Sequence, residues 1–215
     1  MKIYLTRHSQ TIWNQEGRLQ GHQDSPLTAD GKENALALKK YIQDINFDYI
    51  YSSPILRAYT TACLLFDKQE QDIIQDERLS EMNFGIFEGQ KTSDIAKDKN
   101  NSELYRNLWD YPEKFTRIPD GESYDEVIKR VKSFLDNLKQ LDNDSTIMIV
   151  THGMYFIVML ATMLKLDKKD FVKISHQVVQ GCSLTLVTYD NINYQLEFYN
   201  QHDFLPHTKT PSFIK

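Results

Sequence analysis

Short segments rich in β-branched and aromatic residues alternate with helical segments along this chain, and this alternation constrains the fold most strongly. Buried strands are predicted at residues 2–6, 48–51 and 146–150, with a shorter strand at 73–74. Helical patterns follow the three longer strands and cover residues 28–42, 55–66 and 154–166. Strands that alternate with helices favour layers packed around a mostly parallel sheet. We therefore predict an α/β fold with three layers, α/β/α, around a mostly parallel central sheet.

Turn and capping signals place the remaining elements. Pro54 suits the first turn of the helix predicted at 55–66. Ser123 and Glu126 have the spacing of a capping box, which predicts a helix from there to about residue 141. Residues 183–189 and 194–199 are predicted to form a strand pair, and the tail from residue 201 is expected to run over the surface.

The length and composition suit one domain. The chain has 215 residues, of which 40% are hydrophobic, and this is enough to bury a core. We predict a single domain over residues 1–215. The polar stretch at about 90–120 is interpreted as an insertion with short helices that covers the active site.

Charge and hydropathy exclude several classes of protein. A net charge of −5 argues against non-specific nucleic-acid binding and against a polybasic membrane surface. The longest apolar run, 155–164, is too short to span a bilayer, and a charged Arg7-His8 pair interrupts the N-terminal segment too early for a signal peptide. Cys63 and Cys182 lie too far apart in sequence to suggest a zinc knot or a disulfide scaffold. We expect a cytoplasmic protein with no nucleic-acid or membrane partner.

Polar clusters follow three of the predicted strands. They are Arg7-His8, Ser52-Ser53 leading to Arg57, and Thr151-His152-Gly153. Ligands bind at the carboxyl ends of strands in such sheets, so these clusters are expected to converge. Arginine matches phosphate oxygens with a planar fork of donors, and a neutral imidazole can attack phosphorus. Asn14 is a candidate for a further amide donor.

Each of these residues, taken alone, also has a structural interpretation. A single histidine is more often a hydrogen-bonded structural residue, and the other four histidines are interpreted in that way. They are His22, His176, His202 and His207. Arg57 alone would be a surface residue on a helix. Their common placement at strand ends favours the phosphate site.

Five ordered blocks carry a resemblance to a known family. They are Leu5-Thr6-Arg7-His8-Ser9-Gln10-Thr11 with Trp13-Asn14, Gly17-Arg18, Gln20-Gly21 and Asp24-Ser25-Pro26-Leu27-Thr28-x-x-Gly31; Tyr51-Ser52-Ser53-Pro54-x-x-Arg57-Ala58; Leu79-x-Glu81-x-x-x-Gly85-x-x-Glu88-Gly89; Pro119-x-Gly121-Glu122-Ser123; and Thr151-His152-Gly153. The chain thereby resembles the histidine phosphatase superfamily, in its phosphoglycerate mutase-like branch. The blocks cover positions 2 to 153, and the resemblance implies a phosphoglycerate mutase-like fold.

The resemblance implies roles for the residues of the polar clusters. The family's nucleophile falls on His8, which would form a phosphohistidine that water then hydrolyses. Arg7, Arg57 and His152 would hold the non-bridging phosphate oxygens, and Asn14 would join them. These residues are expected to be both catalytic and phosphate-binding.

The resemblance extends to a proton donor and to backbone contacts. Glu81 matches the carboxyl group that protonates the leaving alcohol and later activates water. Glu88 is the second candidate for this acid, but it is interpreted first as a residue that structures its loop. The backbone near Gln20, Gly21 and Gly153 is expected to approach phosphate, and Gly153 opens a helix whose amides favour an anion.

One pair of residues departs from the family pattern. Ser9-Gln10 stands where the family commonly has Gly-Glu. The Ser9 hydroxyl is expected either to lie near phosphate or to tighten the turn, and substrate preference is expected to shift.

These features predict a metal-independent phosphomonoesterase for small organic phosphates, a phosphoric monoester hydrolase of the histidine acid phosphatase type. No metal or other cofactor is expected, because carboxylates are not paired at ligand spacing and neither H-E-x-x-H nor G-x-x-x-x-G-K-[ST] occurs. The expected partner is a small-molecule phosphate ester. The oligomeric state stays open, with a homodimer through an edge strand near Tyr194 as one possibility.

Three alternatives remain at this point. A bisphosphoglycerate-dependent mutase would use the same residues, but the segment after Glu81 resembles the phosphatase branch more closely. A phosphate-binding protein without turnover would have lost His8 or Glu81, and both are present. A phosphoprotein phosphatase is less favoured by the acidic charge.

The aromatic and apolar residues of the insertion either cover the pocket or form local core. They are Tyr105, Leu108, Trp109 and Phe115.

Overall fold

The computed structural model describes residues 1–66, 72–175 and 179–208 of the chain. Within these residues one six-stranded sheet has the strand order β3-β2-β4-β1-β5-β6. The strands are β1 (Lys2–Arg7), β2 (Tyr49–Ser52), β3 (Ile73–Gln75), β4 (Thr146–Thr151), β5 (Leu184–Tyr189) and β6 (Tyr194–Gln201). The first four are parallel, whereas β5 pairs antiparallel with both β1 and β6. The prediction of a mostly parallel sheet is confirmed.

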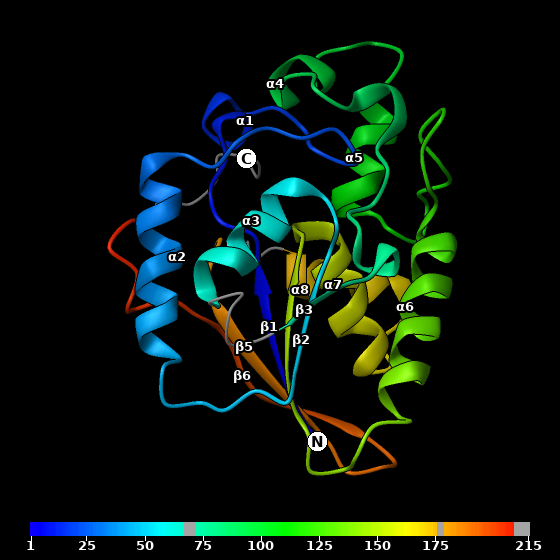
Figure 1. The fold of residues 1–215 in the computed structure, drawn as a ribbon. Helices are drawn as coiled ribbons and strands as arrows, with labels where there is room; N and C mark the ends of the chain where they lie inside the picture. Colours follow the sequence, from blue (N-terminus) through cyan, green and yellow to red (C-terminus); the bar gives the residue numbers. More distant parts are fainter. Residues whose placement is uncertain (67–71, 176–178, 209–215) are drawn as a thin grey trace.

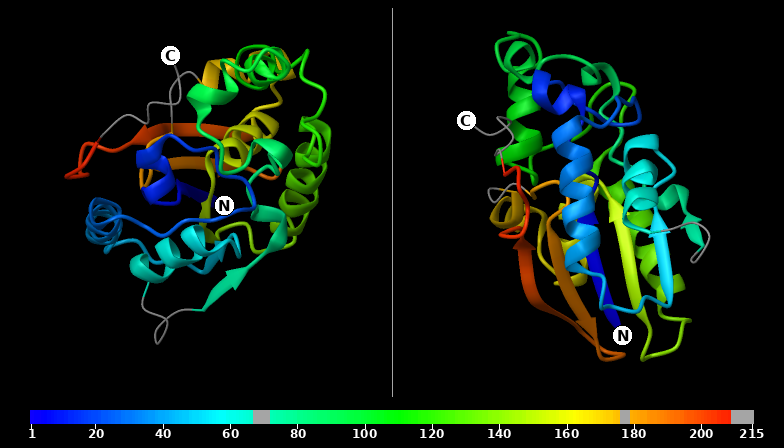
Figure 2. Two further views of the ribbon diagram at one scale, coloured as in Figure 1. Left: turned by 90° about the horizontal axis from the view of Figure 1, so that it is seen from above. Right: turned by 60° about the vertical axis from the view of Figure 1, so that its left-hand side comes forward.

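Helices cover both faces of this sheet (Figure 1 and Figure 2). The helices of the described residues are α1 (Ile12–Glu16), α2 (Ala29–Tyr41), α3 (Leu56–Leu65), α4 (Thr92–Ile95), α5 (Ser102–Asp110), α6 (Tyr124–Leu138), α7 (Gly153–Met163) and α8 (Val172–Ser175). Side chains along β4 alternate between the two faces. Ile147 and Ile149 share a buried cluster with residues of α6 and α7. Met148 and Val150 share another with residues of α2 and α3. This period of two produces the predicted three layers.

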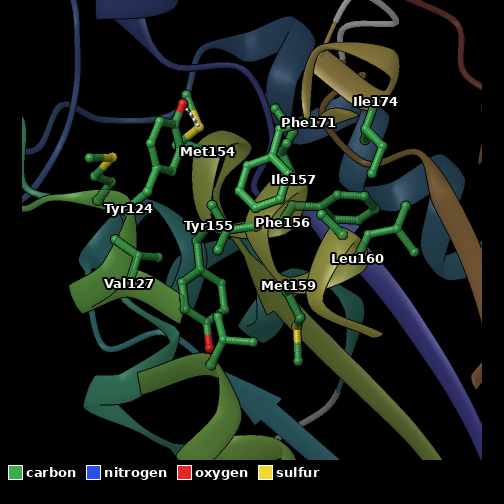
Figure 3. Packing of buried hydrophobic residues seen from close by; sticks show 14 of the residues in the cluster. Tyr124, Val127, Met154, Tyr155, Phe156, Ile157, Met159, Leu160, Phe171 and Ile174 are labelled. Atoms are coloured by element: carbon green, nitrogen blue, oxygen red, sulfur yellow. Dashed lines mark hydrogen bonds between the residues drawn. The ribbon is translucent and has the colours of Figure 1, made fainter. Parts of the chain in front are cut away.

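The helix α7 is buried on nearly all sides. Its residues from position 154 to 161 are all buried, as its continuous apolar sequence predicts. Figure 3 shows Met154 beside Tyr124, and Phe156 and Ile157 near Phe171. Burial of each large side chain contributes roughly 1.5–3 kcal/mol, so α7 is firmly anchored. No helix in the described part of the chain is long and apolar enough to cross a membrane.

The segment interpreted as an insertion contains α4 and α5. Both lie near α1, beyond the end of the sheet toward which β1 points (Figure 1). Tyr105, Leu108 and Phe115 are buried in the cluster that contains α6 and α7, so they form core. The segment therefore packs on the domain through its own apolar side chains.

Local details differ from the sequence-based predictions. The helix α3 begins at Leu56, because Ile55 is extended and serves as its N-cap, so Pro54 precedes the first turn. The short helix α1 was not predicted. The helix α7 ends at Met163, and Lys165 has a left-handed φ of 56° that stops it before residue 166. The helix α6 has the predicted capping box but ends at Leu138.

Two expectations fall partly on residues outside the described ranges. Of the predicted surface tail, Pro206 is exposed, whereas Pro211 lies outside the described residues. His176, interpreted as a structural histidine, also lies outside them.

Candidate active site

His8 follows the last residue of β1 and is held in one tautomer. Its Nδ1 lies 2.7 Å from the Ser9 carbonyl oxygen, and the Nε of Arg57 donates to its Nε2 at 3.2 Å. The proton therefore sits on Nδ1, and Nε2 carries a lone pair. Burial lowers the pKa of His8 well below its ordinary value, and the positive charges of Arg57 and Arg7 lower it further. The imidazole is therefore neutral at neutral pH.

Arg57 is fully enclosed at the start of α3 and connects His8 to the loop that follows α1. Its side chain is 0% exposed. Nη1 donates to the Gln23 carbonyl and to Asp24 Oδ1, both at 2.9 Å, and Nη2 donates to the Gly21 carbonyl at 2.7 Å. These bonds fix the guanidinium against the His8 ring. Four of its five N–H donors are thereby engaged within the described residues.

His152 and Arg7 each place a buried nitrogen atom close to His8. The rings of His8 and His152 lie 5.2 Å apart between centroids. His152 Nε2 lies 2.8 Å from Ser53 Oγ, which also accepts from the Ile55 amide. Burial and nearby arginines lower the pKa of His152 well below its ordinary value.

Two buried nitrogen atoms beside His8 have no hydrogen-bond partner among the described residues. They are His152 Nδ1 and Arg7 Nε. Arg7 also donates through Nη1 to the Val179 carbonyl at 3.0 Å. Burial lowers the pKa of Arg7 to about 10, so it stays charged at neutral pH. Buried polar nitrogen atoms are rarely left unpaired, so these two atoms, one of them on a charged guanidinium, indicate a place for an anion.

Glu81 occupies the N-terminus of α7. Its Oε1 accepts from the amides of Met82 and Tyr155, both at 2.8 Å, and its Oε2 accepts from the amide of Met154 at 3.1 Å. A helix N-terminus stabilises a carboxylate at this place. The amides expected near Gly153 to bind a ligand anion are therefore partly used by Glu81. Oε2 accepts one of these bonds and Oε1 accepts two, and Glu81 lines a cavity together with Arg7.

One cavity brings most of the predicted residues together. Its predicted members are Arg7, His8, Asn14, Gln20, Glu81 and Gly153. Its apolar members are Leu19, Phe84, Trp109, Met154, Ile157 and Val179, and Arg18 adds a second arginine. Arg57, His152 and Gly21 do not line it. Among the residues considered for a lid, only Trp109 contributes to the lining.

Asn14 and Gln20 are held by the turn around α1. Asn14 Oδ1 accepts from the Thr11 amide at 3.1 Å in the capping box of α1. Gln20 Nε2 donates to Thr11 Oγ1 at 2.7 Å, and its Oε1 accepts from Ser25 Oγ at 3.1 Å. Both side chains are thus fixed at the cavity wall.

Gly21 and Glu88 together shape the loop that holds Arg57. A Cβ on Gly21 would lie 2.0 Å from Glu88 Oε1, so no side chain fits there. Glu88 accepts from the amides of His22 and Phe84 through Oε1 and from that of Gln23 through Oε2. These contacts agree with the interpretation of Glu88 as a residue that structures its loop.

Ser9 and Gln10 bond to the start of α2. Ser9 Oγ donates to the Gly31 carbonyl at 2.6 Å, and Gln10 Oε1 accepts from Thr28 Oγ1 at 2.8 Å. Of the two placements expected for the Ser9 hydroxyl, the structure has the one that tightens the turn. The departure from Gly-Glu therefore acts on the loop after β1.

Sequence reasoning assigned no role to Arg18 or to the hydroxyl of Ser53. Both belong to quoted blocks, so their place in the pattern was available, but their contacts depend on distant loops. Arg18 Nη1 donates to the Gly89 carbonyl at 2.8 Å and its Nε to Glu16 at 2.6 Å. No group of three or more His, Cys, Asp or Glu side chains in the described residues is arranged to hold a metal ion.

Comparison with known proteins assigns this architecture to a family. The model of the histidine phosphatase superfamily (branch 1) matches residues 3–202. The chain belongs to the histidine phosphatase superfamily. A relative named probable phosphoglycerate mutase GpmB, from Escherichia coli O1:K1, is 31% identical over 191 residues, which is 88% of this chain and 85% of the relative.

Two solved structures of the superfamily fold resemble the chain closely. YhfR from Bacillus stearothermophilus has a TM-score of 0.87 at 28% identity, over 95% of this chain and 98% of that chain. The alpha-ribazole phosphatase from Shigella flexneri has a TM-score of 0.82 at 26% identity, over 94% of this chain and 97% of that chain. The phosphoglycerate mutase-like fold is thereby confirmed for this histidine phosphatase superfamily member.

Proposed function

We propose that this protein is a metal-independent phosphomonoesterase that acts on small organic phosphates through a phosphohistidine on His8. The observation that carries the proposal is a neutral imidazole whose Nε2 lone pair is held only by the exchangeable bond from Arg57 Nε, beside two buried nitrogen atoms, Arg7 Nε and His152 Nδ1, that have no partner among the described residues. Such an arrangement suits a phosphoryl group, whose oxygens take the donors while phosphorus faces the nucleophile. The phosphatase named among the structural relatives supports the same reaction class.

The reaction follows in two displacements. His8 Nε2 attacks phosphorus, the bond from phosphorus to the ester oxygen breaks, and the Glu81 carboxyl group gives its proton to the leaving oxygen. A water molecule then attacks phosphorus and gives a proton to the Glu81 carboxylate. The bond from phosphorus to nitrogen breaks, which restores neutral His8 and releases inorganic phosphate.

The surrounding donors stabilise the charge during both displacements. Arg7 Nε and His152 Nδ1 bind the non-bridging oxygens, and Arg57 exchanges its bond to His8 Nε2 for one to the phosphoryl group. The bond from Nδ1 to the Ser9 carbonyl keeps the ring oriented throughout. These residues supply the positive charge that a metal ion supplies in other phosphatases.

The cavity favours a phosphatase over a mutase. A mutase that returns the phosphoryl group to a carboxylated substrate needs basic groups for that carboxylate. The described cavity lining has Arg7 and Arg18 as its arginines and an otherwise largely apolar wall. Arg18 is paired with Glu16. We therefore place the organic part of the ester on the wall that includes Phe84 and Trp109.

The test is hydrolysis of p-nitrophenyl phosphate in the presence of a chelator. Wild type should release phosphate, whereas His8→Ala should release none. Glu81→Ala should lose less activity, because p-nitrophenol is an acidic leaving group that needs little protonation. His202→Ala is the matched control, because within the described part of the chain that ring bonds to the Asn200 carbonyl nearby and lies outside the cavity lining.

A second measurement identifies the intermediate. Mass spectrometry after an alkaline quench should find one phosphoryl group on wild type and none on His8→Ala. If wild type hydrolyses neither this ester nor a panel of sugar phosphates, the phosphatase proposal fails. Turnover primed by a bisphosphate would then favour the mutase, and phosphate binding without turnover would favour a silent binding protein.

A further inference from the structure

We infer that Arg130 and Glu122 form a positioning pair for the proton donor Glu81, an inference that rests on the proposed function. Neither residue lines the cavity. Arg130 lies on α6, and Glu122 lies in the turn that precedes this helix. Their side chains are 17% and 22% exposed, so the pair is largely shielded from water.

Arg130 holds the main chain immediately around Glu81. Its Nη1 donates to the carbonyls of Arg78 at 2.9 Å and Ser80 at 2.6 Å, and its Nη2 donates to the carbonyl of Glu81 at 3.0 Å. One guanidinium therefore binds three carbonyls within four residues. This part of the chain is a loop after a short 3-10 helix, so it lacks the hydrogen bonds of a regular element to hold it.

Glu122 completes the clamp on the other side of the acid. It accepts from Arg130 through both carboxylate oxygens, Oε1 from Nε and Oε2 from Nη2, each at 3.0 Å. Its Oε2 also accepts from the Asn83 amide at 2.9 Å, and its own amide donates to the Asn83 carbonyl at 2.8 Å. The main chain is thus held before Glu81 by Arg130 and after it by Glu122.

Arg130 also contacts the helix that binds the Glu81 carboxylate. Its guanidinium carbon lies 4.7 Å from the ring centroid of Tyr155, and the Tyr155 amide donates to Glu81 Oε1. The same side chain therefore contacts the loop that carries the acid and the residue whose amide orients it. Loss of this clamp should misplace the carboxyl group, and small misplacements of reacting groups are costly.

This role predicts a loss that depends on the leaving group. Phenyl phosphate and p-nitrophenyl phosphate share an aromatic ring, but phenolate is far more basic than p-nitrophenolate and needs a proton donor. Arg130→Met should lower kcat/KM for phenyl phosphate about 10- to 100-fold. The value for p-nitrophenyl phosphate should stay within about threefold. The ratio kcat/KM is used because it reports phosphoryl transfer to His8, before the shared hydrolysis step.

Matched variants separate positioning from general damage. Glu81→Gln should show the same selective loss, and adding Arg130→Met to it should cause no further selective loss. Arg130→Lys keeps the charge and part of the hydrogen bonding, and should restore part of the activity on phenyl phosphate. Glu122→Gln, like Arg130→Met, should lower kcat/KM more for phenyl phosphate than for p-nitrophenyl phosphate. Arg117→Met removes a 53% exposed arginine that pairs with Glu126, and it should leave kcat/KM for both esters unchanged.

The outcomes are distinguishable. Equal losses on both esters in Arg130→Met, or no loss on either while Glu81→Gln is selective, would overturn the positioning role. If Arg130→Met does not fold, Arg130→Lys and Glu122→Gln decide by the same ratio. Absence of turnover in wild type, or absence of selectivity in Glu81→Gln, would instead count against the proposed function.

Discussion

Acidification below about pH 6.5 should lower the free energy of unfolding through two buried histidines. In the folded protein, burial and neighbouring arginines lower the pKa of His8 and of His152 well below the ordinary value. In the unfolded chain both rings return to ordinary values near 6.5. Below that pH the unfolded state binds protons that the folded state does not, so stability rises with pH in this window and falls with acid.

The magnitude follows from this linkage. A histidine that is protonated only in the unfolded state lowers the free energy of unfolding by about 1.2 kcal/mol when the pH falls from 6 to 5. The two histidines together lower it by about 2.4 kcal/mol. Above pH 7.5 the same pair should contribute almost no slope, because both states are then neutral at these rings. Urea denaturation from pH 8 to pH 5 measures this dependence directly.

A double variant isolates the contribution of these two rings. His8→Asn keeps an amide that can reach the Ser9 carbonyl, and His152→Gln keeps a group that can reach Ser53, but neither variant side chain titrates. The double variant should lose about 2.4 kcal/mol less than wild type between pH 6 and pH 5. Parallel curves for wild type and the double variant would refute the reasoning, because they would show that the two rings take up protons equally in both states.

Three further substitutions test single contacts. Gly21→Ala should lower the free energy of unfolding by about 1–3 kcal/mol in urea denaturation and also reduce turnover, because its Cβ would lie 2.0 Å from Glu88 Oε1. An unchanged free energy of unfolding would contradict this crowding. Ser123→Ala should cost about 1 kcal/mol in thermal unfolding but leave turnover intact, because it removes only the cap of α6; a loss of turnover at full folding would contradict that. Ser53→Ala should lower kcat/KM for p-nitrophenyl phosphate about tenfold, because it removes the hydroxyl that bonds to His152 Nε2 and orients this ring. Full activity would show that another group orients His152.

Local patterns predicted the layers of the fold because those patterns are set by burial. The alternation along β4 places neighbouring residues on opposite faces, and the Ser123–Glu126 spacing forms the capping box that it indicates. The short helix α1 was missed because it has five residues, and its capping box ends in Asn14 rather than the usual glutamate or glutamine.

The candidate site was predictable to the extent that its residues follow strands. Arg7 is the last residue of β1, and His152 directly follows β4. These two strands are parallel neighbours, so the sheet alone brings the two residues together. The engagement of Arg57 by the Gly21 and Gln23 carbonyls was not predictable. Those bonds depend on a loop whose path is set by Glu88, far along the chain.

The start of α7 joins the two halves of the candidate chemistry. His152 is the N-cap of this helix, and the next amides bind the carboxylate of Glu81. A displacement of α7 would therefore move His152 and Glu81 together and preserve the spacing between them. The helix itself is held by its nearly complete burial (Figure 3). Rigid placement of Glu81 thus requires two anchors, α7 for its carboxyl group and the Arg130 clamp for its main chain. Loss of the Arg130 clamp leaves His152 in place, so it should affect proton transfer before it affects phosphate binding.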